Sequence, residues 1–348
     1  MFDLNRGWAF GGLAPDSTSH VLITNDGAVS FADVTSPEPQ PVDENTTKRA
    51  SGYFLDGREA WVMYSSSGGY PVSEAPIIWH TNDGGTTWSQ SSPLSLTGLE
   101  EFFTPGPFAF SDRRHGWLLV HVGAGMHHDY FLLFQTTDGG STWQRVFDPL
   151  TPDESGLQSC EKTGLAFADA QNGWITRDCH GVTEEANIAQ SSDGGRTWRL
   201  LNLPPPAGKP KYFQSNFCGT YSPRLFSPGI GMVALKCQRM EDFTQAEHFL
   251  YFTANNGQDW QVYPYPGGDV LFLDSELGWA LGRDIFQTRD GGETWEKLGS
   301  VTWQGQFTFV DALLGFAIAS NPQTGEIALV KTVEGGKHWE IIRPVVGP

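Results

Sequence analysis

Two short patterns of apolar and polar positions alternate along the whole chain. The first reads apolar-x-[Asp/Ser]-x-x-x-[Gly/Ala]-[Trp/Met/Phe] and leads into an apolar stretch, as in Gly173 to Thr176. The second reads [Ser/Thr]-x-Asp-x-Gly-x-x-Trp. Both set a polar turn between apolar segments of a few residues, which predicts short antiparallel β-strands joined by tight turns.

Each pattern recurs seven times. The first occupies Met1–Trp8, Phe54–Trp61, Phe110–Trp117, Phe167–Trp174, Leu225–Met232, Phe272–Trp279 and Phe309–Phe316. The second occupies Thr24–Phe31, Thr81–Trp88, Thr136–Trp143, Ser191–Trp198, Thr253–Trp260, Thr288–Trp295 and Thr332–Trp339, the first of these in a decayed form. A repeat of about 50 residues is near the length of a four-stranded propeller blade. We therefore predict an all-β fold, a single seven-bladed β-propeller over residues 1–348, with blades near 1–35, 50–92, 105–147, 160–203, 215–264, 268–299 and 304–345.

The second pattern has the chemistry of a structural turn. In Asp138-Gly139-Gly140 the glycines can take positive φ and the carboxylate can accept N–H groups of its own turn, after which Trp143 has a fixed place to pack. The same structural role is expected of Asp83, Trp88, Asp138, Trp143, Asp193, Trp198, Asn255, Trp260, Asp290, Trp295, Glu334 and Trp339. Since the two patterns contain eleven of the 13 tryptophans, blade packing accounts for the high Trp content better than carbohydrate stacking does.

These turns resemble Asp-boxes, also called BNR repeats, which occur in sialidases, sortilin-like receptors and xyloglucanases. The alternation of both patterns most resembles the photosystem II assembly and stability factor-like propellers, a family also widespread in non-photosynthetic bacteria. The resemblance covers essentially the whole chain and implies the fold. It does not define the function, because Asp-boxes are structural and one propeller serves many functions.

In such a blade both patterns form turns at the same face, so variable connections gather at the opposite, loop-bearing face. Long connections are expected at Tyr64 to Ile77, His121 to Phe131, Asp178 to Ile188 and Cys237 to Phe249, in blades two to five. A Pro-rich acidic stretch lies between Phe31 and Phe54, whereas Gly282 to Ile285 in blade six is only a tight turn. Binding residues concentrate on loops held by a rigid scaffold, so the crowded sector is the expected binding surface.

The four cysteines fall in that sector. Cys160 and Cys179 flank one hairpin and Cys218 and Cys237 flank the next, and the midpoint of each pair lies close to its turn. We predict disulfides Cys160–Cys179 and Cys218–Cys237, with four reduced buried thiols as the alternative. Disulfides would place the protein outside the cytosol, whether secreted, periplasmic or lipid-anchored.

The chain opens on the first turn of blade one, so the innermost strand of that blade is expected to be missing. The nine residues after Trp339 are expected to be too few to form both the last strand of blade seven and a strand that replaces the missing one in blade one. We therefore expect a truncated or engineered start, with an upstream strand and an export signal or lipid anchor; a three-stranded first blade is the alternative.

The net charge of the chain limits the classes of partner that it is expected to bind. The 348 residues carry 22 Lys and Arg against 40 Asp and Glu, a formal net charge of −18, which argues against nucleic acid and anionic membranes. No apolar run is long enough to span a membrane. The family's photosynthetic members present a basic, Arg-rich patch, but here the basic residues are dispersed and Lys209 and Lys211 come nearest to a cluster. A photosynthetic role is therefore not expected, and acidic loops predict a cationic partner.

The sequence leaves two classes of function, catalysis and binding. The Arg-Ile-Pro motif of sialidases does not occur, and several arginines lie in short turns, so sialidase activity is set aside. A glycoside hydrolase, with Asp178 and Glu184 as the acid pair, is the alternative to binding. The cluster of His121, His127, His128 and Asp129 is interpreted as a polar loop, without a metal or other cofactor.

The sequence thus predicts a monomeric, non-catalytic binding or assembly scaffold that holds a protein or glycan at its loop face. The expected binding residues are Tyr70, His127, His128, Asp129, Tyr130, Asp178, His180, Glu184, Glu241 and Asp242.

Overall fold

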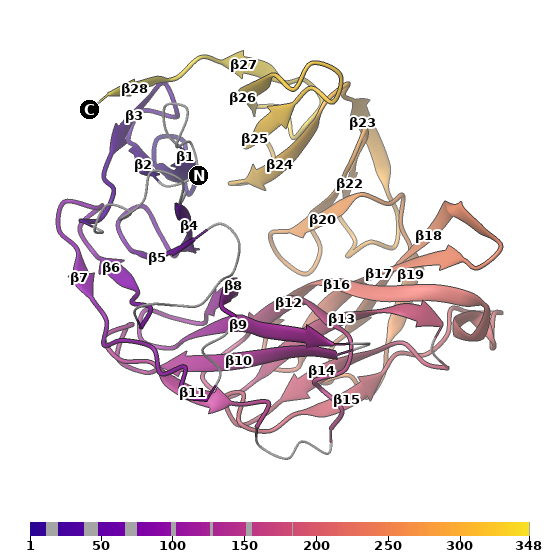
Figure 1. Ribbon diagram of the computed structural model, residues 1–348. Helices are drawn as coiled ribbons and strands as arrows, with labels where there is room; N and C mark the ends of the chain where they lie inside the picture. The colour runs from indigo at the N-terminus through magenta and orange to yellow at the C-terminus, as the bar shows by residue number, and fades with distance from the viewer. Residues whose placement is uncertain are drawn as a thin grey trace.

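The computed structural model describes residues 1–11, 20–37, 48–66, 75–98, 102–125, 128–150, 155–182 and 184–347. Antiparallel sheets follow one another around a ring, and the chain passes once around it from indigo to yellow (Figure 1). This arrangement confirms the predicted all-β propeller. In the described residues the one helix is the short 3-10 turn η1 (Tyr212–Ser215).

Five of the sheets in the described residues have four strands. They contain β1 (Gly7–Gly11), β2 (His20–Thr24), β3 (Ser30–Asp33) and β28 (Val345–Gly347); β4 (Lys48–Phe54), β5 (Ala60–Ser66), β6 (Trp79–Thr81) and β7 (Ser89–Gln90); β8 (Thr104–Phe110), β9 (Gly116–Gly125), β10 (His128–Thr136) and β11 (Gln144–Phe147); β20 (Asp269–Phe272), β21 (Gly278–Leu281), β22 (Asp284–Thr288) and β23 (Glu296–Ser300); and β24 (Gln304–Phe309), β25 (Gly315–Ser320), β26 (Ile327–Thr332) and β27 (Glu340–Ile342).

The sixth sheet has eight strands and contains two copies of each sequence pattern. Its strands are β12 (Glu161–Phe167), β13 (Gly173–Val182), β14 (Asn187–Ser191), β15 (Arg199–Asn202), β16 (Asn216–Ser227), β17 (Ile230–Arg239), β18 (Asp242–Thr253) and β19 (Gln261–Pro264). The two halves are joined where β13 pairs with β16, through Asp178 opposite Gly219 and Val182 opposite Phe217.

The repeated aspartates hold the turns. Asp112 Oδ1 accepts the amide N–H groups of Arg114 and His115 at 2.7 and 2.9 Å. In the Asp-box, Asp138 Oδ1 accepts the Thr136 hydroxyl and the Thr142 amide, both at 2.9 Å. These carboxylates saturate donors that the chain reversal leaves without strand partners, which explains the fixed spacing of both patterns.

The tryptophans of the first pattern join neighbouring sheets. Trp117 is fully buried, donates Nε1–H to the Gly194 carbonyl of the next sheet at 2.9 Å, and stacks on Phe167 with ring centroids 3.6 Å apart. Trp279 repeats this with the Gly335 carbonyl and Phe309. Fully burying an aromatic side chain contributes about 1.5–3 kcal/mol, so these contacts account for much of the cohesion between sheets.

Two of the connections expected as long loops are instead strand extensions. In the segment from His121 to Phe131, β9 and β10 pair as far as Gly125 opposite His128. Between Cys237 and Phe249, β17 and β18 pair as far as Arg239 opposite Asp242. Because extended strands satisfy their backbone groups by pairing with one another, these segments project as hairpins rather than as irregular loops.

The ends of the chain meet in the first sheet. The residues after Trp339 form β27, the last strand of its sheet, and β28. However, β28 pairs in parallel with β3, at the opposite edge of the sheet from β1 (Figure 1). β28 therefore does not replace the innermost strand of blade one, and among the described residues no strand pairs with the edge of β1 that faces away from β2.

Both predicted disulfides are formed, Cys160–Cys179 and Cys218–Cys237. Cys218 and Cys237 are direct partners across β16 and β17. No helix in the described part of the chain is long and apolar enough to cross a membrane.

Candidate functional site

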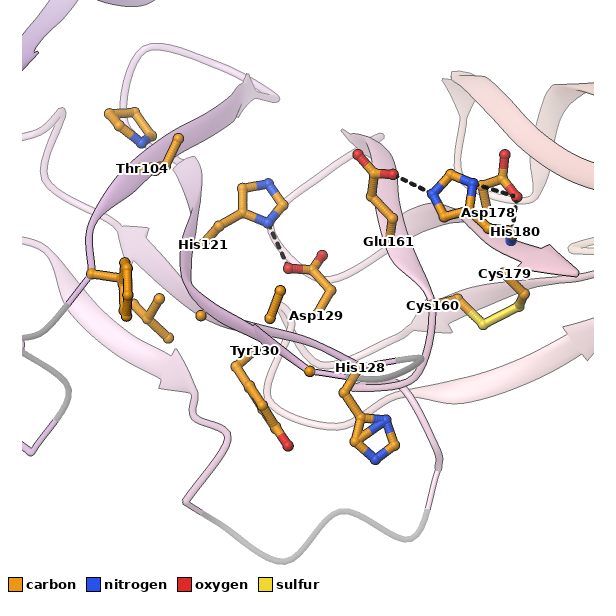
Figure 2. A pocket seen from close by; sticks show the side chains of 16 residues that line it. Thr104, His121, His128, Asp129, Tyr130, Cys160, Glu161, Asp178, Cys179 and His180 are labelled. Atoms are coloured by element: carbon orange, nitrogen blue, oxygen red, sulfur yellow. Dashed lines mark hydrogen bonds and ion pairs between the residues drawn. A yellow bond between two sulfur atoms is a disulfide. The ribbon is translucent and has the colours of Figure 1, made fainter. Parts of the chain in front are cut away.

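A cavity opens between the β9–β10 hairpin and the ends of β12 and β13, in the sector where the sequence places the long connections (Figure 2). Its volume is about 1050 Å³. It is lined by Phe102, Thr104, Pro105, His121, Val122, Gly123, Ala124, Gly125, His128, Asp129, Tyr130, Cys160, Glu161, Asp178, Cys179 and His180. The Cys160–Cys179 disulfide therefore forms part of its wall.

Asp129 is the most enclosed carboxylate of the cavity. A register shift between Tyr130 and Phe131 interrupts the β9–β10 pairing beside it, and bulges of this kind redirect side chains. Asp129 is only 7 % exposed; it lies 2.8 Å from His121 Nδ1 and accepts the Lys162 amide at 3.0 Å. Because an ionised carboxylate can only accept, His121 Nδ1 is the donor of this hydrogen bond.

A buried lysine supports this pair from behind. Lys162 Nζ lies 3.7 Å from Asp129 and donates to the carbonyls of Asp129 and Cys160 at 3.1 and 2.6 Å. Burial alone would raise the pKa of Asp129, but His121 and Lys162 outweigh it and hold that pKa below its usual value. Asp129 is therefore an ionised, fixed group at neutral pH.

A second polar cluster lies where β12, β13 and β16 meet. His180 Nε2 is 2.6 Å from Glu161 Oε2, and the His180 amide donates to Asp178 Oδ1 at 2.8 Å. The hydroxyl of Tyr221, on β16, donates to the other oxygen of Asp178. The hydrogen bond that His180 donates to Glu161 raises the pKa of His180, and burial together with Asp178 raises the pKa of Tyr221.

The backbone gives this cluster its shape. Cys160 and His180 have φ values of 66° and 48°, conformations that non-glycine residues rarely adopt. Glu161 and Asp178 are direct cross-strand partners, and direct partners project from the same face of a sheet. The disulfide beside them ties the ends of β12 and β13, so Glu161, Asp178 and His180 are held together at the cavity wall.

Five of the predicted binding residues line the cavity: His128, Asp129, Tyr130, Asp178 and His180. Tyr70 and His127 lie outside the described residues. Glu184 is exposed and is not part of the cavity lining, so Asp178 does not share the cavity with Glu184. Glu241 and Asp242 lie at the tip of the β17–β18 hairpin and also do not line the cavity.

Glu161, Lys162 and Tyr221 were not predicted from the sequence. Glu161 and Lys162 directly follow Cys160, so the predicted disulfide pointed to their neighbourhood. Nothing in the sequence pattern points to the contact between Tyr221 and Asp178, because it depends on how the two halves of the eight-stranded sheet join.

The acidic side chains of the cavity wall are held in place by neighbouring residues. Asp129, Glu161 and Asp178 already have hydrogen-bonding partners, while His128 packs edge-on to Tyr130 with ring centroids 5.8 Å apart. In the described residues no group of three or more His, Cys, Asp and Glu side chains is arranged to hold a metal ion.

Comparison with known proteins places the fold in context. No family model matches the chain. The photosystem II assembly lipoprotein Ycf48 of Synechococcus sp. (strain CC9902) is 25 % identical over 263 residues, covering 66 % of this chain and 72 % of that protein. A sialidase of Bacteroides fragilis (strain YCH46) is 21 % identical over 285 residues, covering 70 % of this chain and 49 % of the sialidase. The solved polysaccharide lyase Uly1 aligns with a TM-score of 0.58 and 9 % identity, covering 96 % of this chain and 89 % of the lyase.

The chain is therefore a β-propeller related at low identity to Ycf48 and to sialidase propellers of the BNR type, as its repeats predict. It spans about half the length of the sialidase. At 9 % identity the likeness to the lyase shows the shared fold alone.

Proposed function

We propose that this propeller is an extracytoplasmic, non-catalytic binding or assembly module that holds a ligand or protein partner in the cavity beside the Cys160–Cys179 disulfide. The surrounding hairpins, β9–β10, β12–β13 and β16–β18, are the surface that a larger partner would contact. We count the eight-stranded sheet as two blades, since it carries two copies of each sequence pattern; the ring then has seven blades.

The state of the cavity carboxylates carries this proposal. A glycoside hydrolase needs one protonated acid and one available carboxylate flanking the scissile bond. Here Asp129 is ionised and held by His121 and Lys162, and Asp178 accepts hydrogen bonds at both oxygens. Groups already fixed by neighbours suit recognition, because little side-chain freedom is lost when a ligand binds.

Two observations support a location outside the cytosol. Both disulfides are formed, and such bonds persist in oxidising compartments. The relative Ycf48 of Synechococcus is itself described as a photosystem II assembly lipoprotein. An assembly role for the present chain is the corresponding proposal.

The charge of the chain sets the expected partner chemistry. With a net charge of −18, the surface attracts a cationic ligand or peptide at long range. Binding to such a partner weakens as salt is added, because salt screens exposed charges over about 8–10 Å near physiological ionic strength. Affinity that does not change between low and high salt would contradict the cationic partner.

Glycoside hydrolysis is the second candidate, on one specific observation. Glu161 and Asp178 are direct cross-strand partners and line the same cavity. Directly opposed residues have Cβ atoms about 4.5–5.5 Å apart. Such a pair can approach the separation of about 5 Å between carboxyl groups that retaining glycosidases use.

One screen distinguishes the two candidates. The oxidised protein is tested for binding and hydrolysis of glycans and for binding of cationic peptides, beside Glu161→Gln and Asp178→Asn variants. Glu184→Gln is the matched control, because Glu184 is exposed and outside the cavity. We expect binding without turnover, weakened by the two cavity variants and unchanged in the control. Hydrolysis that disappears in both cavity variants and persists in Glu184→Gln would move the chain to the glycoside hydrolases.

A further inference from the structure

A second pocket lies on the eight-stranded sheet, between β16, β17 and β18 on one side and β20 on the other. Its volume is about 340 Å³. Its walls include Tyr221, Ser222, Lys236, His248, Tyr265 and Asp269, and none of these residues lines the cavity beside the Cys160–Cys179 disulfide. This pocket, which we call the Lys236 pocket, is therefore separate from the candidate site.

One row of residues across the sheet joins the Lys236 pocket to that cavity. Each member of the row is the direct cross-strand partner of the next, in the order Glu161, Asp178, Gly219, Lys236 and His248. Direct partners project from the same face of a sheet. Because neighbouring strands lie about 4.7–4.9 Å apart, the carboxylate end of the row and its basic end, Lys236 with His248, begin about 10 Å from each other.

Gly219 separates the two ends of the row. A side chain on Gly219 would meet Asp178 Cγ at 2.6 Å and the Tyr221 hydroxyl at 2.8 Å, so these two groups fill the space above it. Both oxygens of Asp178 already accept hydrogen bonds, from the His180 amide and the Tyr221 hydroxyl. Lys236 forms no ion pair with Asp178 or with any other carboxylate of the described residues. Its ammonium group is therefore available to a ligand.

His248 is the second nitrogen donor of the Lys236 pocket. It pairs with Lys236 as Phe131 pairs with His121 in the sheet of β8–β11, and both partners stand four places after the Trp or Met of the first sequence pattern. Phe131 is fully buried, whereas His248 is half-buried and lines a pocket. A polar ring thus takes the place of an apolar one at this position.

The connection from β19 to β20 fixes the His248 ring. The Tyr265 amide donates to the His248 carbonyl at 3.0 Å, and the two rings have centroids 5.3 Å apart. A side chain on Gly267 would meet the His248 ring at 2.8 Å. Burial and, to a smaller extent, the charge of Lys236 lower the pKa of His248. His248 is therefore a neutral imidazole at neutral pH, and such a ring can still donate one N–H.

The backbone of β16 is distorted where it borders the Lys236 pocket. The pairing of β16 with β17 shifts in register between Tyr221 and Arg224, and Ser222 has a φ of 48°. Bulges redirect side chains, and strained residues concentrate at functional sites. Here the distortion places Ser222 in the pocket wall, where its hydroxyl can bind a ligand.

The opposite wall limits the charge of that ligand. Asp269, the first residue of β20, lines the Lys236 pocket and forms no ion pair in the described residues. Lys236 and Asp269 together give the pocket no net charge, so a ligand with several negative charges would be repelled by Asp269. A single carboxylate has two acceptor oxygens, one for the Lys236 ammonium and one for the His248 N–H. It is therefore the anion that fits these groups best.

We propose that the Lys236 pocket binds the carboxylate of a small organic acid, with one oxygen at Lys236 and the other at His248. Ser222 and Asp269 contact the rest of the ligand. The volume of the pocket lies in the lower part of the range of small-molecule sites, about 300–1,000 Å³. This proposal concerns a site separate from the cavity and does not depend on the proposed function.

The first test measures binding to the full, oxidised protein with two matched pairs of probes. Sodium D-glucuronate is compared with D-glucose, and sodium propionate with propionamide. We expect saturable binding of at least one carboxylate with a Kd below about 10 mM, and at least ~10-fold weaker binding of its neutral counterpart. The carboxylate that binds more tightly distinguishes a sugar acid from an aliphatic acid. No saturable binding of either carboxylate, or equal binding within both pairs, would overturn the proposal.

Two lysine variants then test the location of the site. Lys236→Gln should weaken binding of the carboxylate at least ~10-fold, because it removes the ammonium charge. Lys337→Gln is the matched control, since Lys337 is exposed in the last Asp-box turn and should leave binding unchanged. Equal effects of the two variants, measured on folded protein, would overturn the assignment to the Lys236 pocket.

The NMR titration of the His248 ring gives a readout that does not require a variant. A carboxylate bound at the ring stabilises the imidazolium, so the midpoint of His248 should rise when the protein is saturated with the carboxylate. The neutral counterpart should not move it. A His248 midpoint that stays unchanged at saturation would show that the carboxylate does not bind at His248, and it would overturn the proposal.

Discussion

The sector of β8–β19 and the sector of β20–β27 carry the same two repeated turns and differ at the other end of their strands. β16 and β18 have twelve residues each, whereas β20 and β21 have four. In the short sector, Gly282 and Arg283 are the only residues between β21 and β22. The repeat thus fixes one face of the ring, and variation in strand length at the opposite face creates the cavity.

The long sector also has connections that the short sector lacks in the described residues. Two disulfides close its hairpins, β13 pairs with β16, and the Thr163 hydroxyl donates to the Thr220 carbonyl across the same junction. Long hairpins expose much of their backbone and bury few apolar side chains. These links therefore stabilise the ends of the hairpins, which the repeated turns at the opposite face do not stabilise. The candidate site depends on the links, whereas the ring depends on the repeat.

The largest expected effect is the loss of a buried tryptophan. It tests whether the repeated pattern contributes equally to the stability of both sectors. Trp117→Ala and Trp279→Ala should each lower the free energy of unfolding by about 3–5 kcal/mol, because each removes a fully buried aromatic side chain. Chemical denaturation of the oxidised protein measures both. A cost in the long sector less than half that in the short sector would show that the disulfides, and not the repeat, hold the long sector together.

Trp117→Phe and Trp279→Phe are the matched variants. Each keeps an aromatic ring for stacking and loses the hydrogen bond from Nε1 to the glycine carbonyl of the next sheet. A hydrogen bond contributes about 0.5–1.5 kcal/mol net. The Phe variants should therefore keep most of the stability that the Ala variants lose.

The disulfides give the next largest effect. Cys218→Ser with Cys237→Ser should lower the free energy of unfolding by about 3 kcal/mol, as expected for a closed loop of this length, 19 residues. Cys160→Ser with Cys179→Ser should have a similar cost, because its loop has the same length.

Ligand binding separates these two disulfide variants. Only Cys160 and Cys179 line the cavity, so only their removal should also weaken binding there beyond the loss of stability. Equal loss of binding in both double variants, measured on folded protein well below Tm, would contradict the assignment of the cavity as the binding site.

The repeated turns and the disulfides also show how far the sequence could predict the structure. The spacing of Asp138, Gly140 and Trp143 is local and repeated, so the turns and the sheets around them follow from it. The disulfides follow because each cysteine pair is centred on a predicted turn. The cavity does not follow, because the hydrogen bond from Tyr221 to Asp178 joins residues of different repeats and depends on the β13–β16 pairing. The edge position of β28 depends likewise on a parallel pairing that no repeat of the pattern contains.

A smaller effect is expected at the Asp-boxes. Asp138→Ala and Asp290→Ala should each cost about 1–2 kcal/mol, since each leaves the donors of one turn without an acceptor. Asp138→Asn should cost less, because the chain already carries Asn255 at this position, where its Oδ1 accepts the Asp259 amide at 2.9 Å. Thermal unfolding of the three variants measures this order. A cost of Asp138→Asn equal to that of Asp138→Ala would show that the negative charge, and not the acceptor geometry, stabilises the turn.

Protonation of His180 gives the smallest effect and belongs to the long sector alone. The hydrogen bond to Glu161 and the nearby charge of Asp178 raise the pKa of His180 above its ordinary value of about 6.5. A raised pKa means that the folded state binds the proton more tightly than the unfolded state. The resulting stability is fully present below about pH 6.5 and is lost as the pH rises through the folded pKa of His180. The effect on stability is small, because the side chains of His180 and Glu161 are 66 % and 57 % exposed.

The NMR titration of the His180 ring measures this shift directly. Glu161→Gln should move the midpoint down, since it removes the charge that stabilises the imidazolium, whereas Glu184→Gln should leave it in place. The variant chosen to test hydrolysis therefore also tests the geometry of the cavity: if Glu161→Gln leaves the His180 midpoint unchanged, the two side chains are not paired in solution. The cavity wall is then looser than the disulfide and the β13–β16 pairing imply, and the contrast between a fixed long sector and a simple short sector does not extend to the candidate site.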